Sequence, residues 1–172
     1  MGMPARHYYT AADVLAMPED GNKYEVVHGE LLVSPVPRPR HQFVLFRLVQ
    51  AIANFLDRFP VGHGATGGDL LVVGKEEAAA TKWSQVKNPL LVVEILSPSS
   101  IRQDRFTKRR LYQEVGIPLF WLVDADASTV EVWTPDRRFP VTETESITWH
   151  PEGAGERLVI RLGDLFRLPS QR

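Results

Sequence analysis

Apolar residues recur along the chain at two spacings, one typical of helices and the other typical of strands. Residues 41–59 predict a long amphipathic helix because their apolar positions fall three or four residues apart, at Leu45, Val49, Ile52 and Leu56. Thr10, followed by AADVLAM, predicts a shorter helix with a hydroxyl N-cap. Three prolines in SPVPRPR (34–40) predict a loop, since each proline lacks a backbone donor.

Shorter runs rich in β-branched residues predict strands. Residues 24–27 and 30–33, which meet at His28-Gly29, predict a hairpin. Two unbroken apolar runs, LLVVEIL (90–96) and LFWLVDA (119–125), predict strands buried on both faces, with Trp121 in the core. The remaining assignments are a glycine-rich loop (60–68), a strand bordered by Asp69 (70–73), a helical turn (75–83), a helix (102–116), a strand (129–135), two edge strands (145–150 and 156–162) and a terminal helical turn (162–167).

The order of these elements predicts an α/β protein with a mixed sheet. The helix at 102–116 connects the two buried strands, and a strand–helix–strand unit forms a right-handed crossover when its strands are parallel. A chain of 172 residues that is 44% hydrophobic is long enough to bury one core. No internal repeat or linker divides the sequence, so we expect a single domain over residues 1–172.

The amino-acid composition limits which binding partners and which cellular compartment we expect for this protein. The 20 Lys and Arg residues nearly balance the 21 Asp and Glu residues, so binding to nucleic acid would need local clusters of positive charge. The absence of cysteine excludes disulfide scaffolds, zinc ribbons and cysteine nucleophiles, and it fits a reducing compartment, so we expect the cytoplasm. No stretch approaches the roughly 20 apolar residues that span a bilayer, so we expect no membrane association.

Glu94 is the first candidate for chemistry because it is a carboxylate inside a strand that is predicted to be buried. Its burial would cost on the order of several kcal/mol unless it pairs with a nearby Lys or Arg or coordinates a cation. Asp69 borders what we expect to be a neighbouring strand. Two carboxylates on adjacent strands can share a divalent cation through oxygen ligands, which Mg²⁺ prefers. An ion pair of Glu94 and a metal site at Asp69 and Glu94 are both open interpretations.

The helix at 102–116 carries a further candidate among five crowded cations, which are Arg102, Arg105, Lys108, Arg109 and Arg110. Most of them fit a solvated helix face that is neutralised by Asp104 and Glu114. Lys108 is the exception, because it lies close enough to Glu94 to turn its ammonium toward that carboxylate. There it could orient water or stabilise charge that develops on a phosphate. Tyr112, four residues further on, would help to hold it.

Several short motifs, taken together, resemble one known family. They are Tyr24-Glu25, Gly29-Glu30-Leu31, Arg40-His41-Gln42, Asp69 before an apolar strand, VVEILSPSS (92–100), Lys108 with Tyr112, and FWLVD (120–124). This set resembles the Uma-two family of endonucleases, part of the restriction-endonuclease-like superfamily with its PD-(D/E)XK motif, over residues 9–133. The resemblance implies a restriction-endonuclease-like core, which is a mixed sheet with flanking helices, here with an N-terminal hairpin. It also implies a divalent-metal site and phosphodiester hydrolysis.

The resemblance also implies roles for single residues. Asp69 matches the motif aspartate and Glu94 the motif acid, which makes them the implied metal ligands. Leu96 stands two positions after Glu94, where the superfamily has a lysine, and Lys108 on the following helix takes that role. Glu30 is implied as a third acid, against the alternative of an ordinary exposed strand residue. Two features depart from the family: Gly68 replaces the usual Pro before the aspartate, and the loop 62–68 is shorter than the usual strand–turn–strand.

These observations predict a Mg²⁺- or Mn²⁺-dependent endonuclease that acts on DNA, with Asp69, Glu94, Lys108 and Glu30 as its catalytic residues. Candidates for contacts with the DNA backbone are Arg38, Arg40, Arg102 and Arg105. His41 either faces the catalytic cleft or makes an ordinary surface contact. One alternative is a catalytically inactive nuclease-fold protein that acts as a nucleic-acid-binding or assembly module. The other is a structural homo-oligomer in which Glu94 pairs with Lys108.

Overall fold

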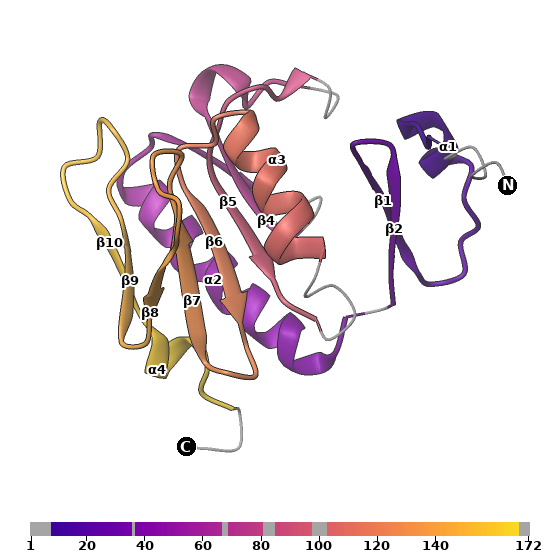
Figure 1. The fold of residues 1–172 in the computed structure, drawn as a ribbon. Coiled ribbons are helices and arrows are strands. Elements are labelled where there is room, and N and C mark those ends of the chain that lie inside the picture. The colour runs from indigo at the N-terminus through magenta and orange to yellow at the C-terminus, as the bar shows by residue number, and fades with distance from the viewer. Residues whose placement is uncertain (1–7, 36, 67–68, 81–84, 98–102, 169–172) are drawn as a thin grey trace, which may run out of the picture.

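The computed structural model describes residues 8–35, 37–66, 69–80, 85–97 and 103–168, and a six-stranded sheet forms its centre (Figure 1). The strands lie in the order β3 (Gly62–Ala65), β4 (Leu70–Gly74), β5 (Pro89–Ile95), β6 (Phe120–Asp124), β7 (Thr129–Trp133) and β8 (Val141–Glu143). β5 and β6 are parallel, whereas the other neighbouring pairs are antiparallel. The mixed sheet that the sequence predicts is therefore confirmed.

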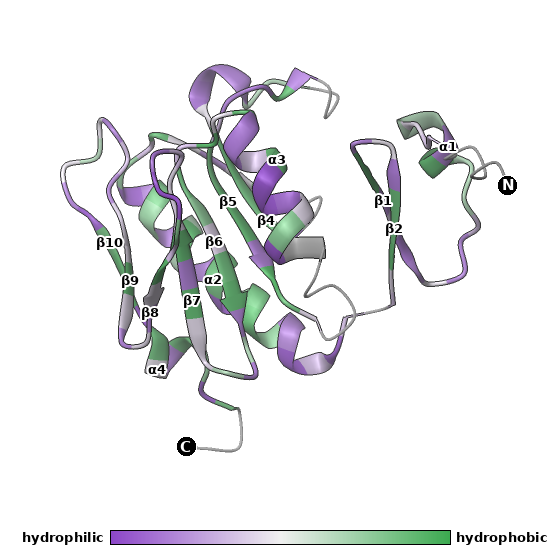
Figure 2. Cartoon of the chain, in the orientation of Figure 1, coloured by the Kyte–Doolittle hydropathy of each residue, from purple (hydrophilic) through white to green (hydrophobic). Residues whose placement is uncertain are grey.

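Helices cover both faces of this sheet (Figure 1). α2 (Pro39–Arg58) lies on one face, and a π-helical segment, Gln103–Lys108, that continues as α3 (Arg109–Glu114) lies on the other. The side chains of β5 alternate between these two layers. Leu91, Val93 and Ile95 belong to the core around α2, whereas Val92 and Leu96 belong to a smaller cluster against Tyr112. β5 is thus apolar on both faces, as Figure 2 shows in green, and Glu94 interrupts that pattern.

The N-terminal residues form a separate hairpin beside α3. β1 (Lys23–Val27) pairs with β2 (Glu30–Ser34), and the two residues between them, His28 and Gly29, have φ angles of 51° and 78°. Positive φ at both positions is the type I′ geometry that suits two-residue hairpins. α1 (Ala11–Leu15) precedes the hairpin and begins with a capping box made by Thr10. His28 Nε2 lies 3.3 Å from Glu114 Oε2, which joins the hairpin to α3.

A second two-stranded sheet completes the core near the C-terminal end of the described residues. β9 (Ser146–Trp149) pairs antiparallel with β10 (Leu158–Arg161), and α4 (Leu162–Leu165) follows directly. The prediction of two edge strands is therefore only partly right. They pair with each other, because their buried side chains, Ile147, Trp149, Leu158 and Ile160, complete the core around α2 instead of extending the central sheet.

Two further segments correct the sequence prediction, and a third confirms it in part. α2 begins inside the proline-rich stretch, since Pro39 occupies its first turn, where a missing N–H costs nothing. The predicted loop at 60–68 contains β3, whose Gly62 lies so close to β4 that a Cβ would come within 2.2 Å of the Val73 carbonyl oxygen. The helical turn predicted at 75–83 is present as a short 3₁₀ helix, Lys75–Glu77, and residues 81–83 lie outside the described residues. Among the helices of the described residues, none combines the length and apolar character needed to cross a membrane.

Candidate active site

The two acids that the sequence singles out lie together at one end of adjacent strands. β4 and β5 pair antiparallel with Leu70 opposite Val93, so Asp69 lies one step further along, beside Glu94 and Ile95. A pocket of about 510 Å³ opens there, and Asp69 and Glu94 both line it. Residues that are 25 positions apart in the sequence thereby share one cavity because two strands pair in this register.

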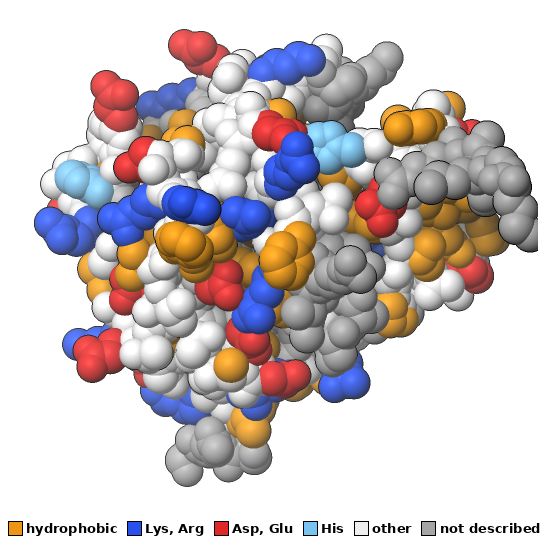
Figure 3. Space-filling view, in the orientation of Figure 1, with side chains coloured by type: hydrophobic (Ala, Val, Ile, Leu, Met, Phe, Trp, Pro, Cys, Tyr) orange, Lys and Arg blue, Asp and Glu red, His pale blue; other side chains and the backbone are white. Residues whose placement is uncertain are grey.

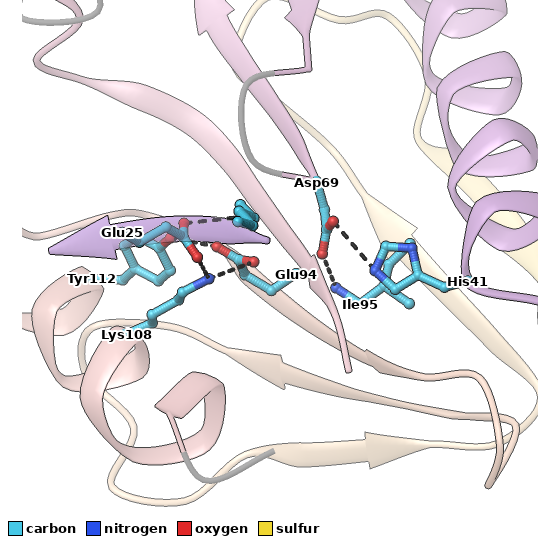
Figure 4. Close-up of polar contacts among 8 residues, drawn as sticks. Glu25, His41, Asp69, Glu94, Ile95, Lys108 and Tyr112 are labelled. Carbon is cyan, nitrogen blue, oxygen red and sulfur yellow. Dashed lines mark hydrogen bonds and ion pairs between the residues drawn. The ribbon is translucent and has the colours of Figure 1, made fainter. Parts of the chain in front are cut away.

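Asp69 is held from the side of α2 by a backbone amide and an imidazole (Figure 4). Its Oδ2 accepts a hydrogen bond of 2.5 Å from the Ile95 N–H, and its Oδ1 lies 3.3 Å from His41 Nε2. Asp69 and His41 are 8% and 6% exposed. Burial by itself raises the pKa of Asp69, but the hydrogen bond and charge of His41, together with the Ile95 amide, outweigh burial and leave the pKa below its usual value. Asp69 is therefore a carboxylate at neutral pH.

Glu94 is held from the side of α3 by a phenol and an ammonium (Figure 4). Its Oε1 accepts a hydrogen bond of 2.7 Å from the Tyr112 hydroxyl, and its Oε2 lies 3.1 Å from Lys108 Nζ. Lys108 and Tyr112 are four residues apart, so they point from the same side of their helix. The sequence predicts that Tyr112 holds Lys108; in the structure both side chains bind Glu94.

Glu25 is the residue that sequence reasoning missed. It lies on β1 of the N-terminal hairpin, lines the same pocket as Asp69 and Glu94, and places Oε2 2.9 Å from Lys108 Nζ. Glu30, the third acid implied by the resemblance, lies elsewhere: it is exposed and lines a different pocket, between the hairpin and α3. One signal was present in the sequence, because strand periodicity places Glu25 on the same side of β1 as Val27, which is buried.

The arginines expected to contact DNA differ from one another. Arg40 donates from Nε to the Ala125 carbonyl oxygen at 2.8 Å, and Arg105 lies 3.1 Å from Glu131, so both contact groups of the protein itself. Arg38 is exposed at the start of α2. Arg102 and Gly68 lie outside the described residues. On the face drawn in Figure 3, basic side chains lie close to acidic ones, so that face mixes both signs of charge.

The donor chemistry of this pocket fits a hard divalent cation. Glu25, Asp69 and Glu94 supply carboxylate oxygens, the ligands that Mg²⁺ and Mn²⁺ prefer. Within the described ranges, no three acidic or histidine side chains are already drawn together closely enough to hold a metal ion. Binding would therefore need these side chains to shift. Glu94 can make such a shift most readily, since its partner Lys108 has a second carboxylate within reach.

The sheet, its flanking helices and the paired acids define a protein of the nuclease-fold class. Residues 11–158 match the Uma2 family model, described as "Putative restriction endonuclease", and the chain belongs to that family. Its fold also matches a crystal structure of "a putative nuclease belonging to DUF820" from Anabaena variabilis, with a TM-score of 0.74 and 21% identity, over 92% of this chain and 97% of that chain. A comparison with curated proteins gave no match. Family and fold together support a nuclease.

Proposed function

We propose that this protein is a Mg²⁺- or Mn²⁺-dependent endonuclease that hydrolyses phosphodiester bonds in DNA and acts in the cytoplasm. The observation that carries the proposal is the pocket lined by Asp69, Glu94 and Glu25, together with the contacts that Glu94 and Glu25 make to the ammonium of Lys108. Membership of the Uma2 family supports hydrolysis as the reaction class.

Asp69 and Glu94 are the residues that would hold the cation. When bound there, a divalent cation supplies charge stabilisation to the phosphate and lowers the pKa of water. His41 and the Ile95 amide fix the carboxylate of Asp69, so this ligand is oriented before any cation arrives. Preorganisation of this kind reduces the cost of assembling the site.

Lys108 is the group that we assign to the phosphate or the attacking water. Its side chain is 6% exposed, and its ammonium contacts Glu25 and Glu94, two acids that line the pocket. An ammonium that is sheltered from water stabilises negative charge on a transferring phosphoryl group more strongly than it would in water. Lys108 thereby takes the role that the motif lysine has in the superfamily.

One observation favours a second candidate, a catalytically inactive nuclease-fold protein that binds nucleic acid or supports assembly. Glu94 and Lys108 form a buried ion pair, so each charge has a partner even when no divalent metal ion is bound. Under this alternative the pair is structural, and the protein binds nucleic acid without cutting it.

Two parallel measurements separate these candidates. Mn²⁺ is titrated calorimetrically into the wild type, Asp69→Ala, Glu94→Ala and the matched control Glu19→Gln, which removes an exposed acid outside the pocket. Nicking of supercoiled plasmid is followed on the same samples. Binding and nicking that persist in the control and vanish in both pocket variants are expected. If the wild type binds DNA but does not bind Mn²⁺ and does not nick the plasmid, the protein is the inactive nucleic-acid-binding module.

A further inference from the structure

Lys108 lies between two carboxylates that come from different parts of the chain. Its Nζ is 3.1 Å from Glu94 Oε2 on β5 and 2.9 Å from Glu25 Oε2 on β1 (Figure 4). The side chains of Lys108 and Glu94 are each 6% exposed, whereas that of Glu25 is 26% exposed. The central sheet supplies the buried acid, and the N-terminal hairpin supplies the more accessible one.

A cation that binds Glu94 must change the surroundings of Lys108. Like charges repel strongly in a sheltered pocket, and a buried ammonium without a counter-charge is strongly unfavourable. Lys108 therefore needs another acidic partner at the moment when Glu94 turns to the cation. Glu25 already contacts the same ammonium, so this exchange requires no long movement of the lysine side chain.

We propose that Glu25 is a positioning residue that retains Lys108 when a divalent cation takes over the carboxylate of Glu94. The hairpin is then part of the active site, because it keeps the ammonium beside the pocket in both states. This inference rests on the proposed function, since it concerns what happens as the metal binds. It gives Glu25 a role that differs from that of a metal ligand, which would contact the cation itself.

The first test is a titration cycle with Mn²⁺ that uses Glu25→Gln and Lys108→Met, separately and combined. Glu25→Gln removes the carboxylate that receives Lys108 when the divalent cation takes over Glu94, so Mn²⁺ affinity falls about tenfold, a typical size for coupling between contacting residues. In the Lys108→Met background, Glu25→Gln reduces Mn²⁺ affinity several-fold less, since no ammonium then needs a new partner. Glu19→Gln, an exposed acid in the turn before β1, controls for the loss of one negative charge.

An equal or larger loss of affinity in the Lys108→Met background would overturn the proposal, because Glu25 would then act on the cation directly. Unchanged affinity for Mn²⁺ in Glu25→Gln, with Lys108 present, would overturn it as well. Turnover gives a further readout: kcat falls in Glu25→Gln while KM for DNA changes little, since the lysine acts at the reacting phosphate and not in general DNA binding.

The second test needs no metal, so it separates failure of this inference from failure of the proposed function. Glu94→Gln imitates a Glu94 whose charge has been neutralised. NMR of ¹⁵N-labelled lysine follows hydrogen exchange of the Lys108 ammonium. The Lys108 signal is assigned by its absence in Lys108→Met. Slow exchange is expected to persist in Glu94→Gln and to become about tenfold faster when Glu25→Gln is added. Equally fast exchange in Glu94→Gln and the double variant would show that Glu25 does not retain the lysine. A wild type without Mn²⁺ binding would instead sink the metal mechanism.

Discussion

Asp69 and Glu94 line one pocket at the same end of two paired strands, yet the protein neutralises them by different means. Asp69 contacts a backbone amide of β5 and a buried histidine of α2, and neither group can move far. Glu94 contacts the phenol of Tyr112 and the ammonium of Lys108, which ends a long and flexible side chain. The difference indicates one carboxylate that is fixed and one that can exchange its partner, and four experiments test it.

The largest expected effect comes from Lys108→Met, which removes the cation shared by Glu94 and Glu25. Loss of the ammonium from this buried ion pair should cost about 3 kcal/mol of unfolding free energy, the low end for a broken buried pair. Urea denaturation without metal measures the loss, and Mn²⁺ should restore part of it by replacing the missing charge. The double variant Glu94→Gln, Lys108→Met is the control, since it should recover most of the stability. A loss below about 1 kcal/mol in the single variant would mean that Glu94 does not depend on Lys108.

Asp69→Ala should cost less, about 2 kcal/mol, because it leaves the buried Ile95 N–H without its acceptor while removing the negative charge as well. Asp69→Asn is the matched comparison, since its carbonyl oxygen can still accept that hydrogen bond. We expect Asn to recover most of the stability in thermal unfolding but not the binding of Mn²⁺. Equal stability of the Ala and Asn variants would show that the hydrogen bond from the Ile95 N–H to Asp69 does not stabilise the protein.

Tyr112→Phe tests the contribution of the Tyr112 hydroxyl, one of the two groups that bind Glu94. The ring packs against Phe120 with centroids 4.9 Å apart, and phenylalanine keeps that packing. Losing the hydrogen bond to Glu94 should cost about 1.5 kcal/mol, the lower value for a bond to a charged group, because Tyr112 is only partly buried. Urea unfolding measures the change. If Lys108→Met is combined with Tyr112→Phe, the two losses should not add, since both residues act on Glu94.

The smallest effect is the pH dependence contributed by Asp69, because burial offsets much of what His41 and Ile95 do to its pKa. The pKa in the folded state lies below the ordinary value of 3.8, so folding favours the charged form. Asp69 therefore stabilises the protein fully above about pH 4 and loses that contribution as pH falls through the lowered pKa. Unfolding of the wild type and Asp69→Asn between pH 5 and pH 2, roughly, should show the two curves converging at the acid end. Parallel curves throughout would contradict the lowered pKa.

The sequence by itself determined most of the elements and singled out the two acids. Periodicity of 3.6 or 2 decides which side chains of a helix or strand share a face, so the helix of α2, the hairpin and the buried strands β5 and β6 were predictable from local pattern. A carboxylate within LLVVEIL stood out because it contradicts the apolar run, and the strand beginning after Asp69 placed a second acid near it.

The tertiary structure alone decided which other residues meet those acids. Glu25 and Glu30 lie in the same hairpin, and only the docking of that hairpin beside α3 brings Glu25 to Lys108 while Glu30 lines another pocket. β3 forms from a glycine-rich segment because β4 offers it an open edge, and Arg40 and Arg105 face protein groups because distant loops and strands fold against them. Local pattern fixes the face of an element, whereas the partner across that face depends on how segments far apart in the chain pack together.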